Sequence, residues 1–167
     1  MKKTIILVER DFQDMEVMYP FYRLKEAGMK VVVAGTEKRE YRGKYGYPIN
    51  ADGKIEEYNP QDFDAVVIPG GWAPDYLRRS KAMVNFVKEM DKKGKVVAAI
   101  CHAGWLLCSA NILKGRKSTS VMAIKDDMVH AGALWQDKEV VVDKNFITSR
   151  KPDDLPAFMR EILKKMK

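Results

Sequence analysis

The 167-residue sequence predicts an α/β domain in which helices cover both faces of a mostly parallel sheet. Short apolar runs rich in Val and Ile recur along the chain, and segments with apolar residues at helical spacing separate them. Unbroken apolar strands are typical of a parallel sheet that is buried on both sides. With 46% hydrophobic and 32% charged residues, the chain is no disordered protein and can bury a core as one domain, residues 1–167.

The individual elements follow from these patterns. Strands are predicted over residues 3–8, 30–34, 63–68, 95–100, 139–142 and 146–149. Helices are predicted over 14–28, 80–93 and 102–113, and from Pro152 to the end of the chain. The stretch 40–52 is expected to form a hairpin or a loop excursion. Pro20 lies inside the first helix and predicts a kink or a late helix start.

Composition narrows the class of protein. The 30 Lys and Arg residues outnumber the 23 Asp and Glu residues, for a net charge of +7. These cations are scattered, so a solvated surface is favoured over a nucleic-acid interface. The apolar start of the chain ends at Glu9 without a signal-peptide cleavage site, and no apolar run reaches the roughly 20 residues that span a bilayer. Two cysteines and no export signal indicate a cytoplasmic protein. The scattered charges and short apolar runs indicate that it has no nucleic-acid or membrane partners.

Cys101 lies at the junction between the strand predicted over 95–100 and the helix predicted over 102–113. A residue at such an elbow is lifted above the sheet edge in strained backbone, beside the free N–H groups of the helix start. Those groups stabilise a thiolate, so we expect the pKa of this thiol to lie below its usual value of about 8.5. The spacing alone leaves open that Cys101 is a small buried core residue.

His102 follows the cysteine directly and is one of two histidines. It can exchange a proton with the sulfur if a non-helical elbow turns its ring back, because adjacent residues in a regular helix do not face one another. Cys108 lies seven residues after Cys101 on the same predicted helix. It is expected to be a buried core thiol.

Two other strand ends carry candidate residues. The PGG sequence at residues 69–71 is either a simple tight turn or, with the N–H groups of Gly71 and His102, a site for a developing oxyanion. Glu16 follows the first strand at the same sheet edge as Cys101. A carboxyl close to a thiolate has a raised pKa and can donate a hydrogen bond to the sulfur.

Together these residues resemble the PfpI family of intracellular cysteine peptidases, which belongs to the class I glutamine amidotransferase-like superfamily. The Parkinsonism-associated deglycase belongs to the same superfamily. The resemblance covers nearly the whole chain and rests on FDAVVIPGGWAPDYLR, VVAAICHAGWLL, IKDDMVHAGALW and VVVDKNFITSRKPDDLPAFMREILK. It implies a flavodoxin-like three-layer sandwich. The chain has no nucleotide or zinc motif, and no cofactor or metal is expected.

The resemblance also implies roles for particular residues. Cys101 matches the family nucleophile, Glu16 the glutamate that bonds the reactive sulfur, and Gly71 and His102 the backbone oxyanion donors. In the peptidase branch an acidic residue from a neighbouring subunit completes a Cys-His-acid triad. Asp75 stands at that position, where a glutamate is usual. Relatives form dimers that assemble further, so self-association as a dimer or hexamer is expected.

Two tryptophans follow the turns that carry candidate site residues. Trp72 comes directly after Gly71, and Trp105 lies four residues after Cys101. Each either walls the pocket or packs at a protein interface.

Three functions fit this set of residues. The first is a cysteine-dependent hydrolase, in which Cys101 attacks a carbonyl of a small peptide and forms an acyl-enzyme. This function ranks first because the sequence resembles the peptidase branch of the family more closely. The second is a cofactor-independent glyoxalase or deglycase, in which the sulfur adds to an aldehyde such as methylglyoxal and Glu16 or His102 moves a proton. The third is a redox-sensing stress protein, because an accessible thiol of low pKa oxidises readily.

Overall fold

A computed structural model covers all 167 residues of the chain. Its centre is a seven-stranded sheet of β1 (Lys3–Leu7), β2 (Lys30–Gly35), β5 (Gly53–Lys54), β6 (Ala65–Ile68), β7 (Val96–Ile100), β10 (Val140–Asp143) and β11 (Phe146–Ser149). The strand order is β10-β11-β7-β6-β1-β2-β5. Every neighbouring pair is parallel except β10 and β11. The predicted mostly parallel sheet is confirmed.

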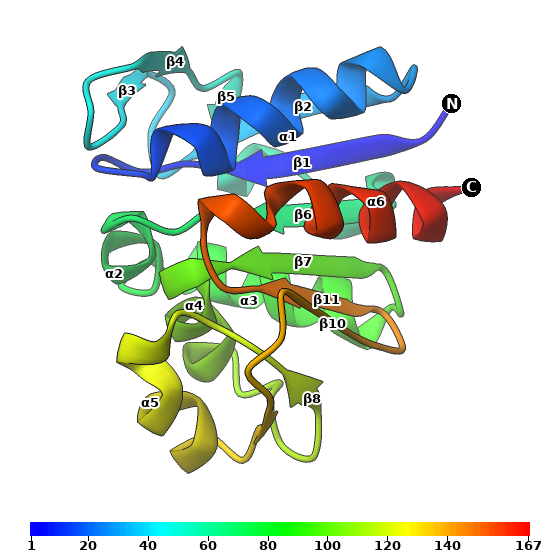
Figure 1. Cartoon of the computed structure of the whole chain (residues 1–167). Coiled ribbons are helices and arrows are strands. Elements are labelled where there is room, and N and C mark those ends of the chain that lie inside the picture. The colour runs from blue at the N-terminus through cyan, green and yellow to red at the C-terminus, as the bar shows by residue number, and fades with distance from the viewer.

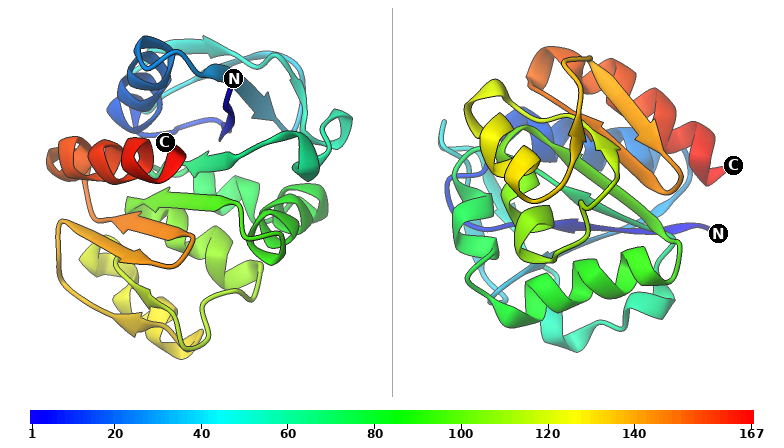
Figure 2. Two further views of the ribbon diagram at one scale, coloured as in Figure 1. Left: turned by 90° about the vertical axis from the view of Figure 1, so that its right-hand side faces the viewer. Right: turned by 90° about the horizontal axis from the view of Figure 1, so that it is seen from below.

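The helices form the outer layers. The α-helices are α1 (Asp14–Glu26), α2 (Ala73–Leu77), α3 (Lys81–Lys92), α4 (Gly104–Ser109), α5 (Lys125–His130) and α6 (Leu155–Met166). Single 3-10 turns are η1 (Ile55–Glu57), η2 (Pro60–Asp62), η3 (Cys101–Ala103), η4 (Met122–Ile124) and η5 (Pro152–Asp154). Figures 1 and 2 show α1 and α6 side by side on one face of the sheet and α3 on the other. This is the expected three-layer sandwich. None of the helices combines the length and apolar character needed to cross a bilayer.

Two small sheets lie outside the main one. β3 (Glu40–Arg42) and β4 (Pro48–Asn50) form an antiparallel hairpin, which confirms the hairpin expected over 40–52. β8 (Lys117–Ser118) and β9 (Leu134–Trp135) form a parallel pair. Neither β8 nor β9 follows from the sequence pattern, because two residues are too few to show an alternation.

The central strands form because their residues are apolar without interruption. β6 and β7 are buried along their whole length, and β1 is buried except at its first residue. Burying them against helices on both faces is the main stabilising contribution to the fold. The carboxyl ends of β1, β6 and β7 meet at the left edge of the sheet in Figure 1, and the segments that follow them lie close together there.

Two helices differ from their predicted form. The predicted late start of the first helix is wrong, because α1 begins at Asp14 and runs through Pro20 to Glu26. The side chain of Gln13 accepts hydrogen bonds from the backbone N–H groups of Met15 and Glu16, and so caps the helix ahead of the proline. The helix predicted over 102–113 is shorter than expected. It opens with a 3-10 turn and ends at Ser109, just before Asn111 takes a left-handed backbone conformation (φ 56°).

The β3–β4 hairpin is tied to the start of α1. The carboxylate of Asp14 accepts the backbone N–H groups of Tyr45 and Tyr47, each at 3.0 Å. The N–H group of Lys44 donates to the carbonyl of Phe12 at 2.9 Å. These bonds hold Lys44 beside the segment that follows β1.

Replacing Asp14 with alanine is expected to cost about 2 kcal/mol of unfolding free energy, because two backbone N–H groups lose a charged acceptor in a site with little water. Urea denaturation measures the loss, and hydrogen exchange should become faster at Tyr45 and Tyr47. Glu40→Ala is the control on the same hairpin, since its ion pair with Arg42 is exposed and such pairs contribute less than about 1 kcal/mol. Equal losses in the two variants would show that Asp14 does not anchor the hairpin.

Candidate active site

Three chain segments converge at the carboxyl edge of the sheet: the start of α1, the turn after β6 and the elbow after β7. The N–H group of Gly70 donates to Oε2 of Glu16 at 2.6 Å. A Cβ atom on Gly70 would lie 2.6 Å from Cβ and 3.0 Å from Sγ of Cys101, and 2.7 Å from Oε2 of Glu16. The turn therefore presses against both the thiol and the carboxyl, and position 70 has no room for a side chain.

The elbow at Cys101 has the strained backbone that was expected. Cys101 has φ of 64°, in the left-handed region that residues with a Cβ atom rarely adopt. The strand ends at Ile100, and η3 begins at the cysteine itself. Cys101 is 9% exposed and packs with the hydrophobic core, so only a small part of it reaches solvent. The backbone N–H groups of Gly71 and His102 interact with its sulfur, and their role as donors to an oxyanion stays a prediction.

The His102 ring turns back toward the cysteine. Its Nδ1 atom lies 3.4 Å from Sγ of Cys101, which the 3-10 geometry of the elbow permits. Burial lowers the pKa of His102, and the nearby Lys44 ammonium lowers this pKa further. The imidazole is therefore neutral at neutral pH and is able to accept a proton.

Burial controls the ionisation of the two groups at the centre of the site. Burial raises the pKa of the Glu16 carboxyl from 4.5 to about 7, against the opposing effects of the Gly70 N–H group, Cys101 and Lys44. The pKa of the Cys101 thiol rises to about 12, because burial and the Glu16 charge outweigh the N–H groups of His102 and Gly71. The raised pKa of Glu16 is confirmed. The expected low pKa of the thiol is wrong, because the donors at the elbow do not compensate for lost water.

Near neutral pH the Glu16 carboxyl is therefore partly ionised, beside a thiol that stays protonated. Glu16 is fully buried, its carboxyl interacts with the Cys101 thiol, and its Oε1 atom accepts no hydrogen bond. A carboxylate with a pKa of about 7, next to a thiol, is well placed to take the thiol proton as the sulfur attacks a carbonyl carbon.

Two further candidate residues, Asp75 and Cys108, lie outside this contact. Asp75 is in α2 and forms an ion pair with Arg79 one turn later. Its reach to His102 of a neighbouring subunit stays a prediction. Cys108 is half-buried rather than a core residue, and its Sγ atom donates to the carbonyl of Asp127 at 3.7 Å.

The structure adds Lys44 to the site. This exposed residue follows β3, and its charge lowers the pKa values of both Glu16 and His102. Its place near Glu16 and His102 depends on the bridge pairing between Phe12 and Gly43. No pattern in the sequence reveals this pairing, because the two segments are joined through tertiary contacts.

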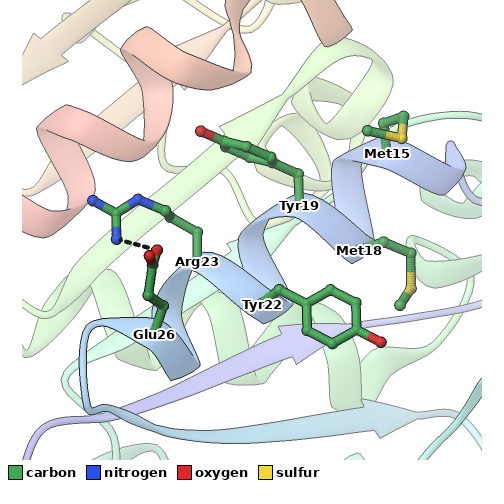
Figure 3. Close-up of a pocket in the computed structure, with 6 residues that line it drawn as sticks. All are labelled: Met15, Met18, Tyr19, Tyr22, Arg23 and Glu26. Carbon is green, nitrogen blue, oxygen red and sulfur yellow. Dashed lines mark hydrogen bonds and ion pairs between the residues drawn. The ribbon is translucent and has the colours of Figure 1, made fainter.

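The largest hollow of the molecule lies away from these residues. It has a volume of about 510 Å³ and sits on the outer face of α1, lined by Met15, Met18, Tyr19, Tyr22, Arg23 and Glu26 (Figure 3). No group of three or more His, Cys, Asp or Glu side chains is arranged to hold a metal ion. The chemistry of the thiol, carboxyl and imidazole therefore identifies the candidate site, and cavity size does not.

Comparison with known proteins shows the family of the chain. Residues 2–165 match the DJ-1/PfpI family. The deglycase PfpI of Pyrococcus furiosus is 47% identical over 165 residues, which are 99% of each chain. A Bacillus subtilis relative named as a candidate cysteine protease is 41% identical over 167 residues, again 99% of each chain. The crystal structure of Drosophila melanogaster DJ-1beta matches with a TM-score of 0.92 and 28% identity, over 99% of this chain and 90% of that one.

Replacing Glu16 with glutamine is expected to stabilise the chain at alkaline pH. The pKa of Glu16 is about 7 in the folded state against 4.5 ordinarily, so the folded state binds more protons between these values and stability falls as pH rises through them. The full cost of about 3 kcal/mol is present above pH 7. Urea denaturation should show the variant more stable by about 2–3 kcal/mol near pH 8, and by much less near pH 4.5.

Glu26→Gln is the matched control, because Glu26 lies on the same helix and is exposed. It should leave stability nearly unchanged at both pH values. An equal effect of the two substitutions would contradict the burial of a charge at Glu16.

Proposed function

The chain belongs to the DJ-1/PfpI family and is an enzyme, and we propose that it is a cofactor-independent glyoxalase or deglycase with Cys101 as its nucleophile. Its substrates would be reactive aldehydes such as methylglyoxal and their adducts with amines or thiols. The single observation that carries this proposal is the contact of the Cys101 thiol with a fully buried Glu16 carboxyl whose pKa is about 7. The names of the relatives, such as the Pyrococcus furiosus deglycase, support it.

The first step forms a bond between Sγ of Cys101 and the aldehyde carbon. The electron pair of the carbonyl double bond moves to oxygen, and the Glu16 carboxylate takes the thiol proton. The backbone N–H groups of Gly71 and His102, which already interact with the sulfur, stabilise the negative oxygen. Transfer of the proton from Glu16 to that oxygen completes a hemithioacetal.

The second step moves hydrogen within the substrate. Glu16 or His102 removes the proton from the former aldehyde carbon and a proton is returned to the neighbouring carbonyl carbon, while the hydroxyl proton of the first carbon moves to the oxygen of the second. The product is a thioester of a 2-hydroxy acid, and water hydrolyses it to release the acid and the thiol. Aldehyde and water are consumed in equal amounts, so no external oxidant or reductant is needed.

Peptide hydrolysis, ranked first from the sequence, becomes the second candidate. The Bacillus subtilis relative favours it, but a triad needs an acid beside His102, and Asp75 is paired with Arg79 within the chain. It would therefore depend on self-association as a dimer or hexamer, which stays a prediction. A redox sensor is less well supported, because the raised pKa of the Cys101 thiol keeps it protonated and slow to oxidise.

Cys101→Ser should lower kcat/KM for methylglyoxal by more than about 100-fold, because the substitution removes the nucleophile. Loss of methylglyoxal and formation of lactate measure the rate, with fluorogenic peptides assayed in parallel. Cys108→Ser is the matched control and should stay within about twofold of wild type, since its sulfur lies outside the site. Retained turnover in Cys101→Ser would reject the nucleophile. Peptide cleavage without methylglyoxal turnover would favour the peptidase.

The pH dependence of kcat/KM should report the ionisation of Glu16. The rate is expected to rise with pH and level off above pH about 7, because only the carboxylate form takes the thiol proton. Lys44→Met should move the inflection to higher pH, since the Lys44 ammonium lowers the pKa of Glu16. A rate that stays constant between about pH 5 and pH 8 would contradict the assignment of Glu16 as the base.

A further inference from the structure

An exposed tryptophan stands beside the thiol. Trp72 directly follows Gly71, and its side chain is 57% exposed. The turn fixes its backbone: Gly71 has φ of 68°, and the N–H group of Trp72 donates to the carbonyl of Asp11 at 2.8 Å. A large aromatic surface left open to water is costly, and a surface of this kind marks a place where something binds.

Trp72 is part of a cluster of three rings. Its centroid lies 5.8 Å from the ring of His102 and 6.3 Å from the ring of Trp105, with interplanar angles of 35° and 31°. The rings of His102 and Trp105 are 5.0 Å apart. Because Nδ1 of His102 is 3.4 Å from Sγ of Cys101, the cluster extends outward from the sulfur itself.

One side of the cluster is held firmly while the other is open. The indole Nε1 of Trp105 donates to Asp127 at 3.2 Å, and the guanidinium of Arg78 lies 5.8 Å from the centroid of the Trp105 ring. The ring of Trp72 has no comparable polar anchor and borders on solvent. The Trp72 ring lies against His102 and Trp105 and is otherwise exposed, so a second planar group is able to stack on its open surface.

We propose that Trp72 and Trp105 bind the planar part of the substrate, so that the enzyme prefers α-oxoaldehydes carried on an aromatic or heteroaromatic ring. This inference rests on the proposed aldehyde chemistry and names its substrate class. Offset or tilted stacking of a ring on an indole corresponds to roughly a 2- to 10-fold gain in binding. Methylglyoxal lacks a ring and gains nothing from the cluster.

Phenylglyoxal and methylglyoxal are the matched pair of substrates, because they differ in the ring and share the reacting group. In wild type the ratio of kcat/KM for phenylglyoxal to that for methylglyoxal should exceed one. Trp72→Ala should lower the ratio by about 5- to 10-fold, mainly through the KM for phenylglyoxal, and Trp72→Phe should restore most of it. Trp135→Phe is the control, since Trp135 lies in β9, outside the cluster, where its indole N–H group donates a hydrogen bond to Ser120. An unchanged ratio in Trp72→Ala overturns the proposal.

A binding measurement separates this inference from the catalytic proposal. Acetophenone has the ring but no aldehyde, so its quenching of tryptophan fluorescence in Cys101→Ser reports binding without turnover. The quenching should be lost in the double variant Cys101→Ser with Trp72→Ala and kept with Trp135→Phe. If quenching occurs but neither aldehyde is turned over by wild type, the ring-binding cluster stands and the proposed deglycase function fails.

Sedimentation of wild type and Trp72→Ala completes the test. The proposal expects the two to have the same molecular mass. If the variant dissociates and acetophenone does not quench the assembled wild type, Trp72 belongs to a subunit interface, and the proposal is overturned.

Discussion

The arrangement of the site depends on one contact, that of the buried Glu16 carboxyl with the Cys101 sulfur. Gly70 makes this contact possible, because any side chain there would occupy the space between the two groups. The same glycine donates its N–H group to Oε2 of Glu16 and so fixes the carboxyl beside the thiol. Backbone strain at Cys101 lifts the sulfur to meet it.

This contact opposes stability and supports chemistry at the same time. A carboxyl sealed away from water binds its proton more tightly, so its ionisation near pH 7 weakens the folded state. The same environment brings the pKa of the base to the pH at which proton transfer is most effective. The parallel sheet and its two helical layers supply the stability that allows such a group to be buried.

Much of the fold follows from the sequence, because its decisive elements have patterns of their own. β1, β6 and β7 are unbroken apolar runs, and parallel strands bring Glu16, Gly71 and Cys101 to one edge. β5, with two residues, has no pattern and exists because Ala34 pairs with Gly53. The same applies to Lys44, which reaches the site through the pairing of Gly43 with Phe12.

The ionisation of the site was not predictable in the same way. N–H donors do lie at the sulfur, as the elbow predicts, but local sequence does not reveal how much water the surrounding chain removes. Desolvation depends on residues from three distant segments and reverses the expected direction of the thiol pKa. The raised pKa of Glu16 was expected, since a buried carboxyl beside sulfur shifts in one direction whatever the details.

The most direct test is the pH dependence of Cys101 alkylation by iodoacetamide, measured in a Cys108→Ser background with Glu16 and with Glu16→Gln. If Glu16 takes the thiol proton, the rate with Glu16 should rise through an inflection near pH 7, and this inflection should be absent in Glu16→Gln. An inflection near about pH 8.5, as for a free thiol, that is the same with and without Glu16 would contradict the account.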